Sequence, residues 1–342
     1  MSQREITEGG PLLDDAGSLR VSGWARRPLL AYDRSAISAP LGRIKERDAY
    51  TIFTDSFAVT FSVADNGYAG IVSASVMDFA GSRHTTEAYV VPFPLGSFAL
   101  PASSEAGAVR IRHKKGSLDF AVMEGGSRIV KVDFPEFDHG SGLRGALVLA
   151  EGLSAESIVT ATPFGAKKDT FAYSLVSPCF SAEGVMQYGD HELIFPKGEA
   201  FAVLDWSRGV RPYRDSWLRG AASGVVDGKL FGFNIGYGSG DASLGTENAV
   251  FSDGVLHKLC SVTIQINPRD RLKPWRITSD DGRLEMTMEP ILDRSSSTRA
   301  LVYSSIQHTV FGRFSGRAVL DDGNAVEFKE ITGFAKQVKK RW

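Results

Sequence analysis

Apolar and polar residues alternate along most of this chain in short runs. Such runs are rich in β-branched and aromatic residues, and they have the length and the two-residue period of β-strands. The clearest runs are SFAVTFSV (56–63), AGIVSASV (69–76), EAYVVPF (87–93), KLFGFNIG (229–236), SVTIQI (261–266) and RLEMTM (283–288). Helical spacing is rare, and its best example is APLGRIKERDAY (39–50). The pattern predicts an all-β protein.

Tight-turn dipeptides separate many of these runs. Asn-Gly and Asp-Gly readily adopt the positive φ angles that two-residue hairpin turns require. The chain has them at Asn66-Gly67, Asp227-Gly228, Asp253-Gly254, Asp281-Gly282 and Asp322-Gly323. The strands are therefore expected to pair as antiparallel hairpins.

The second part of the chain repeats elements of the first. Asp55-Ser56-Phe57 matches Asp215-Ser216-Trp217 at a distance of 160 residues, and Asn66-Gly67 matches Asp227-Gly228 at 161. Thr86-Glu87 matches Thr246-Glu247 at 160, and Arg110-Ile111 matches Arg276-Ile277 at 166. Four matches in order at a nearly constant distance indicate an internal duplication of a domain-sized unit.

The predicted architecture is two tandem antiparallel halves of the calycin or lipocalin type, packed together. Closing a sheet into a barrel removes exposed strand edges, and a small barrel can hold one ligand. The first half is assigned to residues 1–150, and the second half, which carries the candidate site, to 151–342. A single large β-sandwich is the alternative.

The segment VLDWSRGVRPYRDSWLRGAASG (203–224) is unusually dense in charged and aromatic residues. On a strand, Arg211, Tyr213, Asp215, Trp217 and Arg219 would share one face, because alternate side chains point the same way. That face is neither an apolar core face nor an ordinary solvent face. The matching part of the first half has Thr51, Phe53 and Val59 in place of Arg211, Tyr213 and Arg219, so we expect a site in the second half only.

Carboxylates, aromatic rings and arginines define the candidate site. The candidate catalytic residues are Asp205, Asp215 and Glu247, and the candidate ligand-binding residues are Trp206, Arg208, Arg211, Tyr213, Trp217, Arg219, Asn234 and Asn248. Aromatic walls with a few convergent polar groups are typical of ligand pockets. The structural alternative is that these groups form cross-strand ion pairs and pack at the seam between the halves. Glu247 has a counterpart in Glu87, so a structural role is equally open for it.

Composition excludes several classes of function. Hydrophobic residues make up 43% and charged residues 23% of the 342 residues, and the formal net charge is −1, which gives no basis for nucleic-acid binding. The basic C-terminal cluster of Lys336, Lys339, Lys340 and Arg341 is interpreted as a solvated tail. Two distant cysteines, Cys179 and Cys260, and histidines without metal-site spacing predict no disulfide framework, no metal and no cofactor. With neither a signal peptide nor an apolar run long enough to span a membrane, the expected location is the cytoplasm. Nothing indicates an oligomeric state.

Several segments together carry a family resemblance. LDWSRGVRPYRDSW, FGFNIGYGSGD, TENAVFSDGVLHKL, PWRI and GFAKQVKKRW resemble the bacterial family known as domain of unknown function 2804, over essentially the whole chain. More distantly, the chain is similar to lipocalin-like double-barrel proteins, which include carotenoid hydratases and cyclases. Asp215-Ser216-Trp217 is a loose counterpart of their Asp-His-x-Trp motif and lacks its histidine.

Two hypotheses of function follow from these residues. In the first, the protein binds a mostly apolar or amphipathic small molecule with a polar end and, if it is an enzyme, transforms it by hydratase, isomerase or cyclase chemistry. Asp215 or Asp205 would donate the proton. In the second, paired carboxylates and stacking aromatic residues act on carbohydrate. A non-catalytic binding or structural module is the third possibility.

Overall fold

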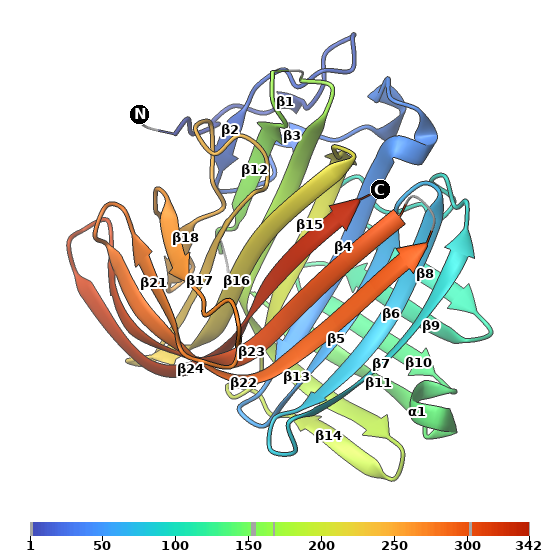
Figure 1. The fold of residues 1–342 in the computed structure, drawn as a ribbon, viewed down its shortest axis with the longest axis vertical. Helices are drawn as coiled ribbons and strands as arrows, with labels where there is room; N and C mark the ends of the chain where they lie inside the picture. The colour runs from blue at the N-terminus through green and yellow to red at the C-terminus, as the bar shows by residue number, and fades with distance from the viewer. Residues whose placement is uncertain (1–2, 152–154, 167, 301–302, 342) are drawn as a thin grey trace.

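Two large antiparallel sheets make up almost all of the protein in the computed structural model, which describes residues 3–151, 155–166, 168–300 and 303–341 (Figure 1). Each sheet curls around its own core to form a half-barrel, and the two pack together. The prediction of an all-β fold with two tandem barrel halves is confirmed.

The first sheet has 13 strands. Ten of them follow one another in the spatial order β7 (Arg83–Pro92), β6 (Ala69–Asp78), β5 (Phe57–Asp65), β4 (Ile44–Phe53), β15 (Phe201–Val210), β13 (Phe171–Tyr188), β11 (Leu143–Ala150), β10 (Arg128–Phe134), β9 (Gly116–Val122) and β8 (Ala108–His113). In addition, β12 (Ile158–Pro163) joins β13 to β2 (Gly23–Ala25), and β14 (His191–Phe195) pairs with β13.

The second sheet has nine strands. Their spatial order is β19 (Val255–Lys258), β18 (Ala249–Ser252), β17 (Lys229–Tyr237), β16 (Arg214–Val226), β24 (Ala325–Arg341), β23 (Tyr303–Val319), β22 (Leu284–Ala300), β21 (Trp275–Ser279) and β20 (Val262–Gln265). The long strands β22 to β24, orange to red in Figure 1, lie in front of the blue strands of the first sheet.

The remaining elements are small. A parallel pair, β1 (Gly10–Pro11) and β3 (Leu30–Ala31), lies near the N-terminus. The helical turns are η1 (Arg34–Ala36), η2 (Leu41–Arg43) and α1 (Phe137–Gly140). Within the described residues, no helix has the length and apolar character that crossing a membrane requires.

The predicted turns fall at strand connections. Asn66-Gly67 joins β5 to β6, and Asp227-Gly228 joins β16 to β17, so the repeated dipeptides occupy equivalent hairpins of the two sheets. Gly67 and Gly228 have φ angles of 77° and 76°, a region that glycine enters without steric cost. The other three dipeptides also join consecutive paired strands, namely β18–β19, β21–β22 and β23–β24.

The segment with the best helical spacing, 39–50, forms mainly a strand. Only Leu41–Arg43 forms a helical turn, and the chain then enters β4. This strand pairs along its whole length with β5 on one side and β15 on the other. Both of its faces are covered, and this tertiary pairing overrides the local helical spacing.

The chain passes from the first sheet to the second between Val210 and Arg214. Residues 158–210, which the sequence analysis placed in the second half, therefore form strands β12 to β15 of the first sheet. In the first sheet β4, β15 and β13 lie between β5 and β11, whereas β16 pairs directly with β24 in the second. Strands inserted into one copy have no counterpart in the other, so the repeat pattern could not place them.

Three apolar clusters form the core of the protein, and one of them joins the two halves. One lies inside the first sheet and includes Phe61 and Trp206, and a second lies inside the second sheet and includes Phe233 and Trp275. The third contains residues of both sheets, such as Phe53, Phe79, Phe201, Phe311 and Phe334. The halves thus pack through their outer faces, and part of that seam is apolar.

Candidate functional site

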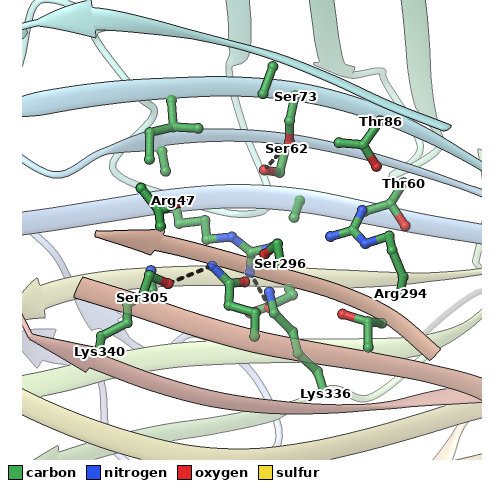
Figure 2. Close-up of a pocket in the computed structure, with 18 of the residues that line it drawn as sticks. Arg47, Thr60, Ser62, Ser73, Thr86, Arg294, Ser296, Ser305, Lys336 and Lys340 are labelled. Atoms are coloured by element: carbon green, nitrogen blue, oxygen red, sulfur yellow. Dashed lines mark hydrogen bonds and ion pairs between the residues drawn. The ribbon is translucent and has the colours of Figure 1, made fainter. Parts of the chain in front are cut away.

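Along the rest of the seam lies a partly open cavity of about 360 Å³, between β4–β7 and β15 of the first sheet and β16 and β22–β24 of the second (Figure 2). We call it the seam cavity. Its lining is mainly basic and hydroxylated. The basic residues are Lys45, Arg47, Arg211, Arg219, Arg294, Lys336 and Lys340, with His84, and the acidic ones are Glu46 and Asp205.

Strand alternation places these side chains. On β15, Asp205 and Ser207 face the cavity, while Leu204 and Trp206 between and beside them point into the first core. On β4, Lys45, Arg47 and Thr51 face the cavity in the same way. The polar face of each strand is thus covered by the other half of the protein rather than by bulk solvent.

Hydroxyl groups form the first-sheet wall of the cavity. They are linked across neighbouring strands by hydrogen bonds between Thr51 and Thr60 (3.4 Å), Ser62 and Ser73 (3.1 Å), and Thr86 and Ser75 (3.0 Å). A hydroxyl group can donate one hydrogen bond and accept two. Each linked hydroxyl therefore keeps capacity to bind a polar ligand atom.

An ion-pair network forms the wall contributed by β15 and β16. Arg219 donates to Asp205 at 2.5 Å and makes a two-point contact with Glu247 at 2.7 and 2.5 Å. Arg47 donates to the other oxygen of Asp205. Burial alone would raise the pKa of Asp205, but the charges of Arg219 and Arg47 hold it well below its usual range. Asp205 is therefore a fixed anion at neutral pH.

Asp215 belongs to a separate pair. Its carboxylate accepts a hydrogen bond from Arg211 at 3.3 Å. Burial raises the pKa of Asp215, and the Arg211 charge opposes that rise. Each of the three predicted catalytic carboxylates is thus bound by an arginine.

Two cations in the cavity contact no carboxylate of the described chain. Arg294 donates to the Ser75 hydroxyl, and Lys336 makes neither a hydrogen bond nor an ion pair with a described residue. Burial and the neighbouring Arg47 lower the pKa of Arg294 to about 10 and that of Lys336 well below its usual value. Burial, with repulsion from Arg47 and Arg211, lowers the pKa of Lys340 to about 7. In Figure 2 the side chains of Arg47, Arg294 and Lys336 point into the same space.

The structure brings together only some of the residues predicted from sequence. Asp205, Arg211, Trp217 and Arg219 line the seam cavity. Asp215 and Glu247 lie behind it as the partners of Arg211 and Arg219. β16 begins at Arg214, so Arg211 and Tyr213 precede the strand. Of the five residues predicted to share a face, Asp215, Trp217 and Arg219 lie on β16 at alternate positions and do share one.

The other predicted ligand-binding residues lie away from the cavity. Trp206 and Arg208 are on the opposite face of β15 and only 2% and 1% exposed, and Arg208 is bonded to Asp48 at 2.6 Å. Tyr213 is exposed and precedes β16. Asn234 and Asn248 are buried, and their amides bond the main chain of Glu247, Gly236 and Cys260. Through these hydrogen bonds the two asparagines hold the loop between β17 and β18 in place.

The sequence analysis missed the residues that give the cavity its charge. Lys45 and Arg47 fall in the segment with the best helical spacing, and Lys336 and Lys340 in the predicted tail. That tail is in fact β24, an inner strand of the second sheet, on which Lys336 and Lys340 face the cavity while Lys339 is exposed. The sequence did contain a signal for a covered strand here. Alternate positions hold Phe334, Lys336, Val338 and Lys340, so one face of the strand carries both apolar residues and lysines.

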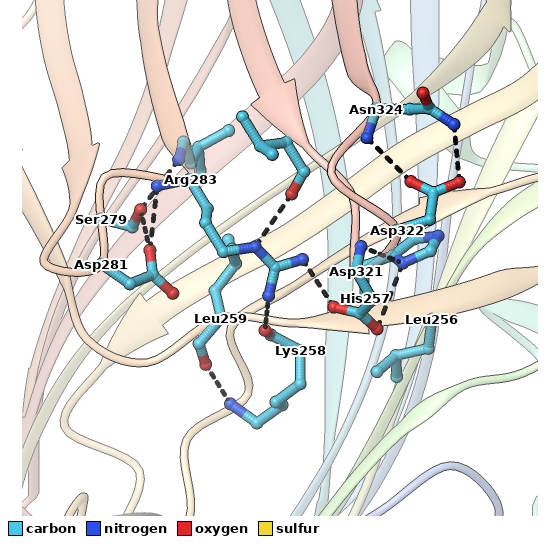
Figure 3. A network of polar contacts seen from close by, with 12 residues as sticks. Leu256, His257, Lys258, Leu259, Ser279, Asp281, Arg283, Asp321, Asp322 and Asn324 are labelled. Carbon is cyan, nitrogen blue, oxygen red and sulfur yellow. Dashed lines mark hydrogen bonds and ion pairs between the residues drawn. The ribbon is translucent and has the colours of Figure 1, made fainter.

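A second polar network lies at the hairpin ends of the second sheet (Figure 3). Arg283 donates to Asp321 at 2.6 Å, to the Val319 carbonyl at 2.9 Å and to the Lys258 carbonyl at 3.0 Å, and His257 lies 3.3 Å from Asp321. These contacts tie three hairpins together. Across the described part of the chain, the one group of potential metal ligands is Cys260, Asp280 and Asp281, all exposed, which is common without a bound ion.

Comparison with known families settles the relationship of the chain. The profile of domain of unknown function 2804 (DUF2804) matches residues 3–342. The chain belongs to this family. The resemblance predicted from the sequence segments is therefore confirmed for this DUF2804 protein, and no match is found among curated proteins.

Solved structures with similar folds include two proteins of low sequence identity. A candidate AttH protein from Nitrosomonas europaea is 13% identical, with a TM-score of 0.53 over 91% of this chain and 98% of that one. Kievitone hydratase from Nectria haematococca is 11% identical, with a TM-score of 0.52 over 97% of this chain and 98% of the hydratase. At these identities the likeness shows a shared double-barrel fold.

Proposed function

We propose that the protein binds a small organic anion in the seam cavity and transfers a proton to or from it. The observation that carries this proposal is the pair of cations, Arg294 and Lys336, that line a partly open cavity and make no ion pair with a carboxylate of the described residues. Desolvated cations are costly unless an anion compensates them. A bound anion would supply that compensation.

The chemistry that fits these groups is addition or removal of water next to a carbonyl group. Burial lowers the pKa of Lys336 well below its usual value, so its amine loses its proton more easily than a free lysine, and the neutral amine can take a proton from the carbon beside the carbonyl. Arg47 and Arg294 would stabilise the negative charge that develops on the carbonyl oxygen. The same proton, returned to the departing hydroxyl group, releases water. The hydratase among the structures of similar fold agrees with this class of reaction but does not establish it.

The ligand expected from the cavity is more polar than the sequence indicated. Of the aromatic wall predicted there, only Trp217 lines the cavity, together with Phe334 and Ile71. This apolar strip can hold a small hydrocarbon or ring portion, while the cations hold the charged end. The carbohydrate hypothesis gains no support, because Asp205 is the one candidate carboxylate in the lining and two arginines bind it.

Loss of Arg294 should weaken anion binding. The dye 8-anilinonaphthalene-1-sulfonate, an apolar molecule with an anionic end, is expected to bind the native protein at one site. Arg294→Gln should weaken this binding about tenfold, the effect of one charge-assisted hydrogen bond. Fluorescence titration measures it. Arg299→Gln, on the same strand but exposed, is the control. Equal affinities in the two variants would contradict the proposed site.

Anion affinity should rise as the pH falls. Lys340 has a lowered pKa of about 7, so it gains its charge between pH 8 and 6, and a bound anion favours that charged form. Arg47, Arg211, Asp215 and Lys45 surround Lys340, and of these Lys45, with a pKa of about 7, titrates in the same range. Titrations from pH 6 to 9 should therefore show a slope that Lys340→Arg reduces, because arginine stays charged. If Lys340→Arg leaves the pH dependence of anion affinity unchanged, Lys340 is not the group that causes it.

A further inference from the structure

Strand pairing places Lys336 in the seam cavity. On β24 it lies directly opposite Arg219 of β16 on one side and Thr309 of β23 on the other, and all three residues line the cavity. Directly opposed side chains of neighbouring strands lie on the same face of a sheet. The amine of Lys336 therefore extends from an inner strand of the second sheet into the space between the two sheets (Figure 2).

No acidic residue binds this amine. Within the described residues, Lys336 makes neither a hydrogen bond nor an ion pair, and both oxygens of the nearby Asp205 already accept from arginines, Arg47 and Arg219. Burial, and after it the positive charge of Arg47, lower the pKa of Lys336 well below its usual value. An amine that is desolvated and lies next to another cation is the usual form of a nucleophilic lysine, because its lone pair is more often available.

Lys258 shows the contrast. Burial lowers its pKa as well, to about 8, yet its amine donates hydrogen bonds to the Thr246 hydroxyl at 2.9 Å and to the Asn248 carbonyl at 3.1 Å. These bonds use the amine of Lys258 as a donor that holds the main chain in place. The amine of Lys336 has no such bonds to the described residues and faces a cavity, which is the arrangement expected of a reactive group.

The arginines beside Lys336 indicate which electrophile would reach it. Arg47 and Arg294 point into the same space, and arginine pairs well with carboxylates (Figure 2). Arg47 donates to Asp205 and Arg294 to Ser75, but a guanidinium group has five N–H donors, so both keep donors for a ligand. A neutral amine attacks the carbonyl carbon of a ketone or an aldehyde. A molecule with both features is a small oxo acid.

We propose, building on the anion site of the proposed function, that Lys336 forms an imine with the carbonyl carbon of a small oxo acid. The nitrogen lone pair forms a bond to the carbonyl carbon, and one proton passes from the nitrogen to the carbonyl oxygen through water. The resulting hydroxyl group then leaves with the remaining proton of the nitrogen as water, and the C=N double bond forms. One amine and one carbonyl group thus give one imine and one water molecule, with no oxidant or reductant. The carboxylate of the oxo acid lies on Arg47 and Arg294.

Reductive trapping on the full-length protein at pH 7 tests this assignment. Sodium cyanoborohydride transfers a hydride to the carbon of an imine and makes the bond to lysine permanent. The probes are pyruvate, 4-oxopentanoate and acetone, and peptide mass spectrometry locates the adducts. At least one oxo acid is expected to label Lys336 about ten times more than Lys339, which is exposed on the same strand. Acetone, which lacks the carboxylate, should label Lys336 about ten times less than that oxo acid.

Loss of the arginine should reduce the labelling of Lys336. At an oxo acid concentration below saturation, Arg294→Gln should lower it about tenfold, because the carboxylate loses one charge-assisted hydrogen bond. Arg299→Gln, exposed on the same strand as Arg294, should leave it unchanged. Urea unfolding curves of both variants that match the native curve show that lost labelling is not lost folding.

The outcomes separate this inference from the function on which it rests. If the anilinonaphthalene dye binds and responds to Arg294→Gln while neither oxo acid labels Lys336 more than Lys339, the imine is overturned and the anion site stands. If acetone labels Lys336 as strongly as the oxo acids, or if the oxo acids label another lysine in preference, the assignment is also overturned. If the dye does not bind and Lys336 is not labelled, the proposed function itself fails.

Discussion

Lys336→Met is expected to abolish anion binding and, at the same time, to make the protein harder to unfold. Lys336 faces the seam cavity, where burial and Arg47 lower its pKa well below the ordinary 10.5. Replacing a partly buried charge that lacks an ion-pair partner among the described residues by an apolar side chain of similar length commonly stabilises a protein, and we expect a gain of about 1 to 2 kcal/mol. Urea denaturation measures the gain, and dye titration measures the loss of binding.

The gain in stability from Lys336→Met should become smaller as the pH rises. A lysine whose pKa is lower in the folded state destabilises that state most at low pH, where it must carry its charge in both states. The penalty disappears as the pH rises towards 10.5, where the unfolded chain also loses the proton. The stabilisation by Lys336→Met should therefore be larger at pH 6 than at pH 9. Lys339→Met, exposed on the same strand, should change stability by no more than about 0.5 kcal/mol at either pH.

A less stable Lys336→Met protein would mean that the amine is part of the scaffold. The expected combination of higher stability and lost binding is instead typical of functional sites, where desolvated charges are retained for the ligand. The neighbouring ion pairs show the contrast. Arg219 is fully matched by Asp205 and Glu247 and holds β15, β16 and the 247 loop together.

Local sequence patterns predicted the fold well because the relevant forces are local. The turn at Asn66-Gly67 and its counterpart at Asp227-Gly228 depend on φ angles within two residues. Alternation in β5 and β6 reports which side chains share a face. Together they were enough to predict antiparallel hairpins, two barrel halves and the repeat.

The candidate site could be predicted only in part, because alternation does not show what covers a face. Thr60, Ser62 and Ser73 read as a solvent face, yet the second sheet covers them. Arg219 and Asp205 stood out because the 203–224 segment is dense in charge, but Arg294 and Lys336 lie far away in the sequence among ordinary polar residues. Only the packing of the two halves brings these residues to one cavity.

Arg219→Leu is expected to cost about 3 to 5 kcal/mol of stability, the effect typical of removing one partner from a buried ion pair. Arg219 is only 7% exposed, and it binds both Asp205 and Glu247. Without it Glu247 loses its arginine, and Asp205 keeps its ion pair with Arg47. The free energy of unfolding from urea denaturation measures the loss, with Arg214→Leu, exposed on the same strand, as the control.

The loss should be smaller at low pH, because the arginine that lowers the pKa of Asp205 is gone and the variant can protonate Asp205 more easily than the native protein. The double variant Arg219→Leu/Glu247→Leu should recover part of the stability, since it removes one of the stranded charges. If Arg219→Leu costs no more than Arg214→Leu, the network does not hold the two halves together. Arg219 would then be free to act on the ligand, as the sequence first suggested for the face of β16 that carries it.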